Sequence, residues 1–177
     1  LTFAEPFIFD VMKFMNELAV EEAKAPGTRR RAYADPAWRE KLRSEVTPLF
    51  RNWWDRVVIA WAPSARELEE QPLGAAARKL GKDPVDLALD LALANDLQAR
   101  FRMAVMNFDE QEVAELITDP HTIIALSDAG AHASQLCDAC YATYLLGHWV
   151  RERKTFTIEQ AVHNLTQRPA EMFGITD

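Results

Sequence analysis

The sequence predicts an α/β fold that is rich in helix, and three observations lead to this class. Residues 56–61 (RVVIAW) and residues 122–126 (TIIAL) are short, β-branched and apolar at successive positions, which is typical of strands covered on both faces. Roughly sixty residues of mostly helical periodicity lie between them. Strands separated by helix in this way predict a β-α-β order. We therefore expect the two segments to be adjacent, parallel strands of one sheet.

Helices are predicted before, between and after the two strands, because apolar residues recur there at helical spacing. Several helices have a start or stop signal: Asp35 and Asp83 each precede a proline, Asp109 precedes another helix, and Gly81 ends one. The segment TIEQ, which begins at Thr157, has the spacing of a capping box. The expected helices are residues 6–18, 36–50, 73–80, 84–94, 110–117, 134–153 and a last one from 157 to about 173.

The composition limits the classes of function. The chain has 177 residues, 49% of them hydrophobic, which is enough for one globular domain with a core. No apolar run approaches the ~20 residues that cross a bilayer, so we expect no membrane span. The net charge of −7 offers no surface for nucleic acid, and the basic cluster at residues 29–31 is expected to be a solvated loop. The C-x-x-C of Cys137 and Cys140 has no second half, which favours reduced thiols in a cytoplasmic protein.

A polar group follows the second predicted strand. Ser127 and Asp128 come directly after the apolar run, and His132 lies four residues beyond Asp128, after a turn of small residues. Active sites of parallel α/β proteins lie at the carboxyl ends of the strands, so Asp128 is a candidate catalytic carboxylate with His132 near it. Aspartate before small residues is equally suited to a turn or a helix cap. The residues alone leave both interpretations open.

Two motifs resemble a known family. The segment ALSDAGAH (125–132) followed by LTQRPAEMFGITD (165–177) resembles the C-terminal part of the amidohydrolase superfamily, in particular its D-aminoacylase (N-acyl-D-amino-acid deacylase) branch. The order of segments over residues 57–93 is similar to the seventh strand and the helix pair of this branch. The resemblance implies the C-terminal portion of a TIM (β/α)8 barrel of the metal-dependent hydrolase type. A single partial domain would then span residues 1–177, with a helical insertion at 1–55 and strands seven and eight with their helices at 56–177.

The resemblance also implies a reaction. In this family the aspartate after the eighth strand takes a proton from a water bound to one or two divalent metals, commonly zinc, and delivers it to the leaving amine nitrogen. Here that residue would be Asp128, which could also touch the metal, while Ser127 and His132 would face the substrate or support the site. The family's H-x-H pair and its other metal ligands are not in this sequence, and one aspartate does not make a zinc site. We therefore expect no tightly bound metal and no activity from this chain alone, as part of an enzyme that hydrolyses N-acyl-D-amino acids.

The sequence also predicts partners. The chain begins at Leu1 without an initiator methionine, so we expect it to be a piece of a longer protein whose N-terminal barrel segment is its partner. Two strands alone would leave open edges and an uncovered apolar face, which predicts self-association into a homo-oligomer. The alternative function is a non-catalytic helical interaction module that keeps the barrel's sequence as a scaffold.

Overall fold

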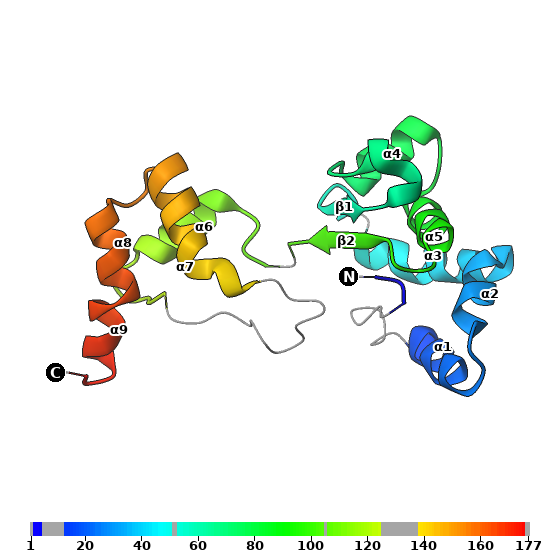
Figure 1. Cartoon of the computed structure of the whole chain (residues 1–177), viewed down its shortest axis with the longest axis horizontal. Coiled ribbons are helices and arrows are strands. Elements are labelled where there is room, and N and C mark those ends of the chain that lie inside the picture. Colours follow the sequence, from blue (N-terminus) through cyan, green and yellow to red (C-terminus); the bar gives the residue numbers. More distant parts are fainter. Residues whose placement is uncertain (1, 5–12, 51–52, 105, 125–137, 176–177) are drawn as a thin grey trace. The chain divides into compact units, whose positions relative to one another are not determined.

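A computed structural model describes residues 2–4, 13–50, 53–104, 106–124 and 138–175 of the chain (Figure 1). The chain divides into two compact units, Leu1–Ala104 and Val105–Asp177. Helices dominate the described part of each unit. Each unit is therefore considered by itself.

The N-terminal unit is built from five α-helices, one 3-10 helix and two short strands among its described residues. They are α1 (Lys13–Lys24), α2 (Thr28–Ala34), α3 (Pro36–Phe50), β1 (Val57–Trp61), η1 (Pro63–Leu68), α4 (Leu73–Leu80), α5 (Pro84–Ala94) and β2 (Arg100–Met103). The predicted helix ends are confirmed where a local signal was present. The Asp83 carboxylate accepts a hydrogen bond from the Val85 amide at the start of α5, and Gly81 ends α4 with φ of 64°. The basic residues 29–31, expected in a solvated loop, lie instead in α2.

The two strands of the N-terminal unit pair antiparallel, with Val58 opposite Arg102 and Ile59 opposite Phe101. After α5 the chain reverses through Asp96 and Leu97, whose φ angles of 52° and 63° turn it back along β1. The strand predicted at 56–61 is thus confirmed as β1, but its partner was predicted wrongly. Residues 122–124, the described part of the second predicted strand, form no strand.

The edges of β1 explain why the parallel arrangement is wrong. The N–H of Ile59 donates to the carbonyl of Gln71, and its C=O accepts from the N–H of Glu70. These groups point away from Phe101, because the groups of one residue face one edge of the strand. Around Ile59, β2 therefore takes one edge and residues 70–71 take the other. No edge remains here for a parallel neighbour, so the predicted TIM-barrel portion with two parallel strands is not the fold of the described residues.

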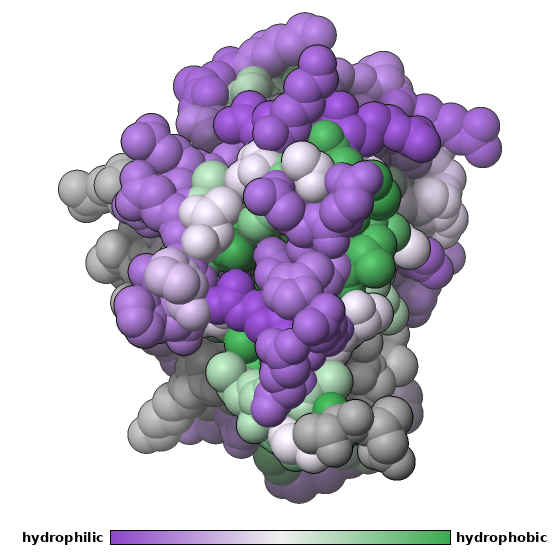
Figure 2. Space-filling view, turned by 90° about the vertical axis from the view of Figure 1, so that its left-hand side faces the viewer, coloured by the Kyte–Doolittle hydropathy of each residue, from purple (hydrophilic) through white to green (hydrophobic). Residues whose placement is uncertain are grey.

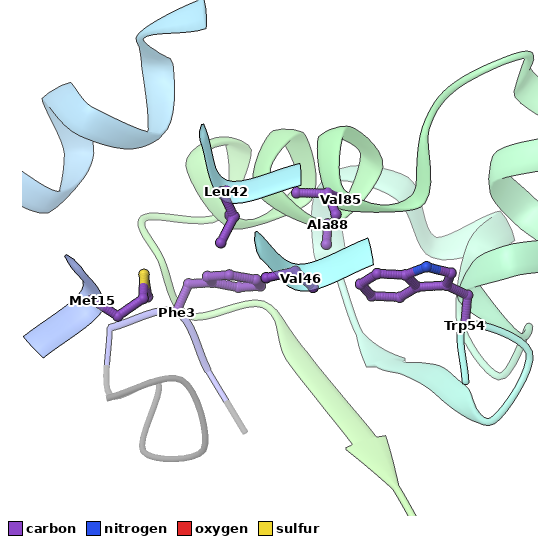
Figure 3. Close-up of a pocket in the computed structure, with 7 residues that line it drawn as sticks. All are labelled: Phe3, Met15, Leu42, Val46, Trp54, Val85 and Ala88. Carbon is purple, nitrogen blue, oxygen red and sulfur yellow. The ribbon is translucent and has the colours of Figure 1, made fainter. Parts of the chain in front are cut away.

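The core of the N-terminal unit lies where α2, α5 and β1 meet. The side chains of Tyr33, Ile59 and Leu89 are fully buried there. Phe3 packs edge-on against both Tyr33 and Phe101, with ring centroids 5.6 and 5.7 Å apart. A small apolar cavity beside this cluster is lined by Phe3, Met15, Leu42, Val46, Trp54, Val85 and Ala88 (Figure 3). Its lining makes it a packing gap of the core, without groups that could do chemistry.

The C-terminal unit consists of short helical segments among its described residues. They are α6 (Glu110–Thr118), the 3-10 helix η2 (Asp138–Cys140), α7 (Tyr141–Tyr144), the π-helix η3 (Leu145–Glu152), α8 (Ile158–Leu165) and α9 (Gln167–Met172). The predicted N-cap of Asp109 is confirmed, and so is the capping box, in which Thr157 and Gln160 exchange hydrogen bonds. The long helix expected at 134–153 is helical over its described part, 138–152, but changes from 3-10 to α to π geometry.

The last predicted helix is divided in two at Thr166, whose ψ of −78° departs from helical geometry. Pro169 gives the physical reason. A proline inside a helix has no N–H to donate and its ring clashes with the carbonyl four residues earlier, here that of Leu165. The chain therefore ends α8 at Leu165 and starts α9 afresh. None of the helices in the described ranges has a stretch that is both long and apolar enough to cross a lipid bilayer.

Candidate functional site

The candidate residues Ser127, Asp128 and His132 lie outside the described residues, and so does Cys137. The structure does describe the chain that leads to them. After α6 the Asp119 carboxylate accepts a hydrogen bond from the His121 amide at 2.7 Å, and the Thr122 hydroxyl donates to the carbonyl of Leu116 at 2.5 Å. These contacts form a tight turn, so the start of the TIIAL segment is fixed to the end of α6.

Arg168 connects this turn to the second family-like motif. It lies in α9, within LTQRPAEMFGITD, and its guanidinium donates to the carbonyl of Pro120 at 2.5 Å and to that of Asp119 at 3.3 Å. Arg168 thus connects the second motif to residues 119–120, which precede the first motif, although about fifty residues separate the two in sequence. The sequence analysis did not identify Arg168. Its position between Gln167 and Pro169 gave no periodicity signal that could have revealed the contact.

The described residues do not fit a metal ion. Among them no group of three histidine, cysteine, aspartate or glutamate side chains lies close enough to hold one. The His121 side chain is 91% exposed and lies 3.1 Å from Asp119, while Cys140 is an exposed thiol. A zinc site needs three or more protein ligands. A metal in a larger enzyme would therefore need ligands from outside these residues.

One histidine of the C-terminal unit is held by charged neighbours. The Nδ1 atom of His148 lies 2.7 Å from Glu152, and its Nε2 atom lies 3.0 Å from Glu110 of α6. The ring stacks on Tyr144, with centroids 4.8 Å apart, and Arg153 also pairs with Glu110 at 3.2 Å. Burial, together with the charges of Glu110 and Glu152, raises the pKa of the Tyr144 phenol. The cluster joins α6 to the π-helix η3.

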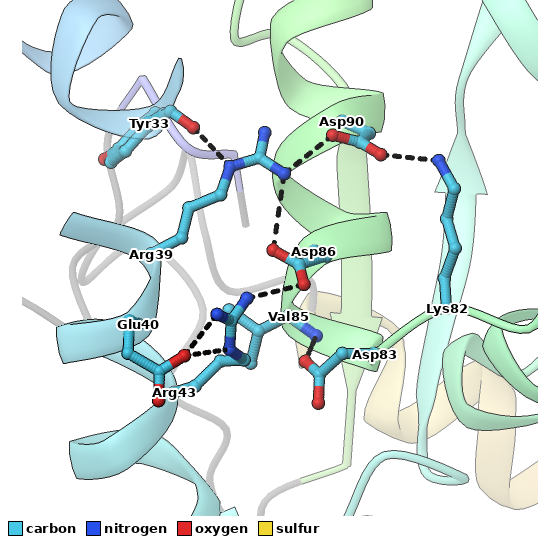
Figure 4. Close-up of polar contacts among 9 residues, drawn as sticks. All are labelled: Tyr33, Arg39, Glu40, Arg43, Lys82, Asp83, Val85, Asp86 and Asp90. Carbon is cyan, nitrogen blue, oxygen red and sulfur yellow. Dashed lines mark hydrogen bonds and ion pairs between the residues drawn. The ribbon is translucent and has the colours of Figure 1, made fainter. Parts of the chain in front are cut away.

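A polar groove of the described N-terminal unit lies between α3 and α5 (Figure 4). Arg39 donates to Asp86 at 3.3 Å, to Asp90 at 2.8 Å and, through Nε, to the carbonyl of Tyr33 at 2.6 Å. The Arg39 side chain is only 15% exposed, which makes it the least exposed side chain of the network. Figure 4 shows it reaching from α3 towards both carboxylates of α5.

The groove also contains a second row of ion pairs. Arg43 pairs with Asp86 at 2.6 Å and with Glu40 on its own helix, and Lys82 pairs with Asp90 at 2.6 Å. Burial alone would raise the pKa of Asp90. The hydrogen bonds and positive charges of Lys82 and Arg39 outweigh burial and lower that pKa.

The chemistry of this groove is that of a structural ion-pair network. Its arginines already contact its carboxylates, and the groove residues include neither a thiol nor a hydroxyl that could act as a nucleophile. The sequence analysis missed the network, although a signal was present. Arg39 and Arg43 are four residues apart on one helix, as are Asp86 and Asp90 on the other, which places each pair on one helix face.

Comparisons with known proteins give relatives but no family. No family model matches the chain, and no solved structure matches it. Similar chains include uncharacterized proteins of Mycobacterium bovis and Mycobacterium tuberculosis, which are 30% identical over 159 residues. The match covers 83% of this chain and 26% of each relative. The chain thus spans about a quarter of the length of the curated relatives it matches.

Proposed function

We propose that the chain is the C-terminal part of a metal-dependent amidohydrolase that hydrolyses the amide bond of N-acyl-D-amino acids or similar compounds. The observation that carries the proposal is the contact of Arg168 with the carbonyls of Asp119 and Pro120. It joins the LTQRPAEMFGITD motif to the chain that leads into ALSDAGAH, as expected if the two motifs serve one site. The barrel fold is not part of the proposal, because β1 pairs antiparallel with β2. Relatives about four times as long are consistent with a part of a larger protein.

In this reaction Asp128 moves a proton. Its carboxylate accepts the proton of the water that attacks the acyl carbon, and the protonated acid then delivers that proton to the amine nitrogen as the C–N bond breaks. Ser127 and His132 would face the substrate or support the site. A divalent ion such as zinc would polarise the acyl carbonyl when bound. We expect this chain to be inactive alone, because its sequence has no H-x-H pair to supply the family's metal ligands. The exposed thiol of Cys140 is consistent with a cytoplasmic location.

The test is Asp128→Asn in the complete enzyme, assayed with N-acyl-D-amino acids. Asparagine keeps the size of the side chain and its turn and capping chemistry but removes the base. The loss of general acid–base catalysis should lower kcat by about 10²–10⁴-fold with little change in KM. Metal content, measured on both proteins, controls for loss of the ion. A kcat within threefold of the parent, at equal metal content, would reduce Asp128 to a turn residue.

A second candidate function is a non-catalytic helical interaction module. The observation that favours it is the predominantly helical structure of the described residues, among which β1 has only an antiparallel neighbour. The same experiment separates the two candidates. A module predicts that the complete protein hydrolyses no N-acyl amino acid and that Asp128→Asn leaves its partner binding unchanged.

A further inference from the structure

Helix α8 has an apolar stripe that the described residues of its unit cover only in part. Positions 158, 161, 162 and 165 lie on one helix face because they are three or four residues apart. Ala161 is fully buried and Leu165 packs against the core of the unit. Ile158 and Val162, on the same stripe, remain 49% and 47% exposed. The stripe is thus wider than the surface it packs against.

The apolar exposure continues through α9 and its end. Met172 is 59% exposed, Phe173 71% and Ile175 59%. Figure 2, which faces the side where α8 and α9 lie in Figure 1, shows apolar surface between hydrophilic side chains. We call Ile158, Val162, Met172, Phe173 and Ile175 the α8–α9 apolar set. The two helices contact each other, and a large exposed apolar patch is typical of a surface that another element covers.

The core of the same unit is small. Its buried apolar residues among the described ones are Leu145, Trp149, Phe156 and Ala161. A unit of this size is expected to have a small free energy of unfolding, because below roughly 70–80 residues a single core rarely contributes more than about 3–5 kcal/mol. Covering the α8–α9 apolar set would add to that core.

Charge argues against a second copy of the chain as the covering partner. Residues 105–177 contain eleven aspartate and glutamate but only four lysine and arginine residues, so this unit carries the whole net charge of −7. The N-terminal unit has sixteen of each sign and is neutral. Two acidic units would repel each other in a symmetric dimer, whereas a surface bordered by lysine and arginine would attract this one.

We propose that the α8–α9 apolar set docks onto the remainder of a longer polypeptide, at an apolar patch bordered by lysine and arginine side chains. The length of the mycobacterial relatives supports this occupant, because about three quarters of each relative lies outside the matched segment. The inference does not depend on the reaction proposed above. It would hold equally for a hydrolase and for an interaction module.

The test places the same substitutions in the 177-residue chain and in the complete gene product that contains it, and measures thermal unfolding of both. Val162→Lys should shift Tm by no more than about 1 °C in the 177-residue chain, because Val162 is half exposed there. In the complete protein it should lower Tm by about 5 °C or more, since lysine would then enter a covered apolar surface. His163→Lys, on the exposed side of the same helix, is the matched control and should be neutral in both.

A second variant tests the proposed lysine and arginine border of the docking patch. Glu171→Lys should lower Tm in the complete protein and leave the 177-residue chain unchanged, because the proposed basic border would be present only in the complete protein. An unchanged complete protein would refute the lysine and arginine border. Equal shifts for Val162→Lys and His163→Lys in the complete protein would overturn the docking itself, as would a gene product no longer than the 177-residue chain. Sedimentation could also show a dimer of the 177-residue chain that Val162→Lys abolishes. A second copy of the chain would then cover the α8–α9 apolar set, and the docking proposal would be wrong.

Discussion

Replacing Arg39 by methionine tests whether the groove between α3 and α5 stabilises the N-terminal unit. The change removes hydrogen bonds to Asp86, to Asp90 and to the carbonyl of Tyr33, while methionine keeps most of the apolar stem. Because the Arg39 side chain is only 15% exposed, its ion pairs are screened less than surface pairs. Asp86 keeps Arg43, however, and Asp90 keeps Lys82, so no carboxylate is left unpaired. We expect unfolding to become easier by about 1–2 kcal/mol.

The matched control is Arg78→Met. Arg78 makes a bidentate ion pair with Asp55, but both side chains are more than half exposed. Such surface pairs contribute about 0–1 kcal/mol, so this variant should lie close to the parent. Urea unfolding followed by tryptophan fluorescence measures both variants, because four of the five tryptophans lie in the N-terminal unit. An Arg39→Met variant no less stable than Arg78→Met would refute the argument.

The same network predicts a pH dependence. The pKa of Asp90 is lower in the folded chain than in the unfolded one, so its contribution to stability is present above the ordinary aspartate range of about 3.9. That contribution is lost as the pH falls through the lowered folded pKa. In Arg39→Met the pKa of Asp90 should lie closer to its ordinary value. The loss of stability below about pH 4 should therefore be shallower than in the parent.

Three further predictions concern local contacts. Glu22→Gln should make the stability of the chain less sensitive to acid, because hydrogen bonds from backbone N–H groups at the start of α2 lower the pKa of Glu22. That stabilisation is present above about pH 4.5 and is lost as the pH falls below it. Urea unfolding at pH 3 and at pH 7 measures the difference. Gly74→Ala should destabilise the chain by about 1–3 kcal/mol, because the new Cβ would lie 2.5 Å from the Asp55 carboxylate. At Gly147 a new Cβ would meet no atom within 4 Å, so Gly147→Ala should stabilise the chain by up to about 1 kcal/mol. The same sign for both in urea unfolding would contradict this reasoning. Lys154→Gly should raise Tm slightly in calorimetry, because Lys154 has φ of 56°, which glycine adopts without strain; a lower Tm would contradict this.

The sequence by itself determined where many helices begin and end. The cap at Asp83, the stop at Gly81 and the capping box of Thr157 and Gln160 were all predictable, because each depends on hydrogen bonds or on a φ angle within a few residues. The location of β1 was predictable for a similar reason, since a short β-branched apolar run favours strand wherever it is buried. Such local preferences do not depend on what the rest of the chain does.

Tertiary structure alone decided what these elements contact. Nothing local in β1 specifies its neighbours, and the turn at Asp96 and Leu97 brought β2 back beside it, whereas the sequence had predicted residues 122–126 as its neighbour. The alternation of exposed and buried side chains in RFRM was a weak signal for β2, but four residues are too few to predict a strand. Arg168 reaches the carbonyl of Pro120 for the same reason that Arg39 reaches Asp90: folding brings distant segments together. Contacts of that kind depend on the packing of the whole unit, which no short stretch of sequence encodes.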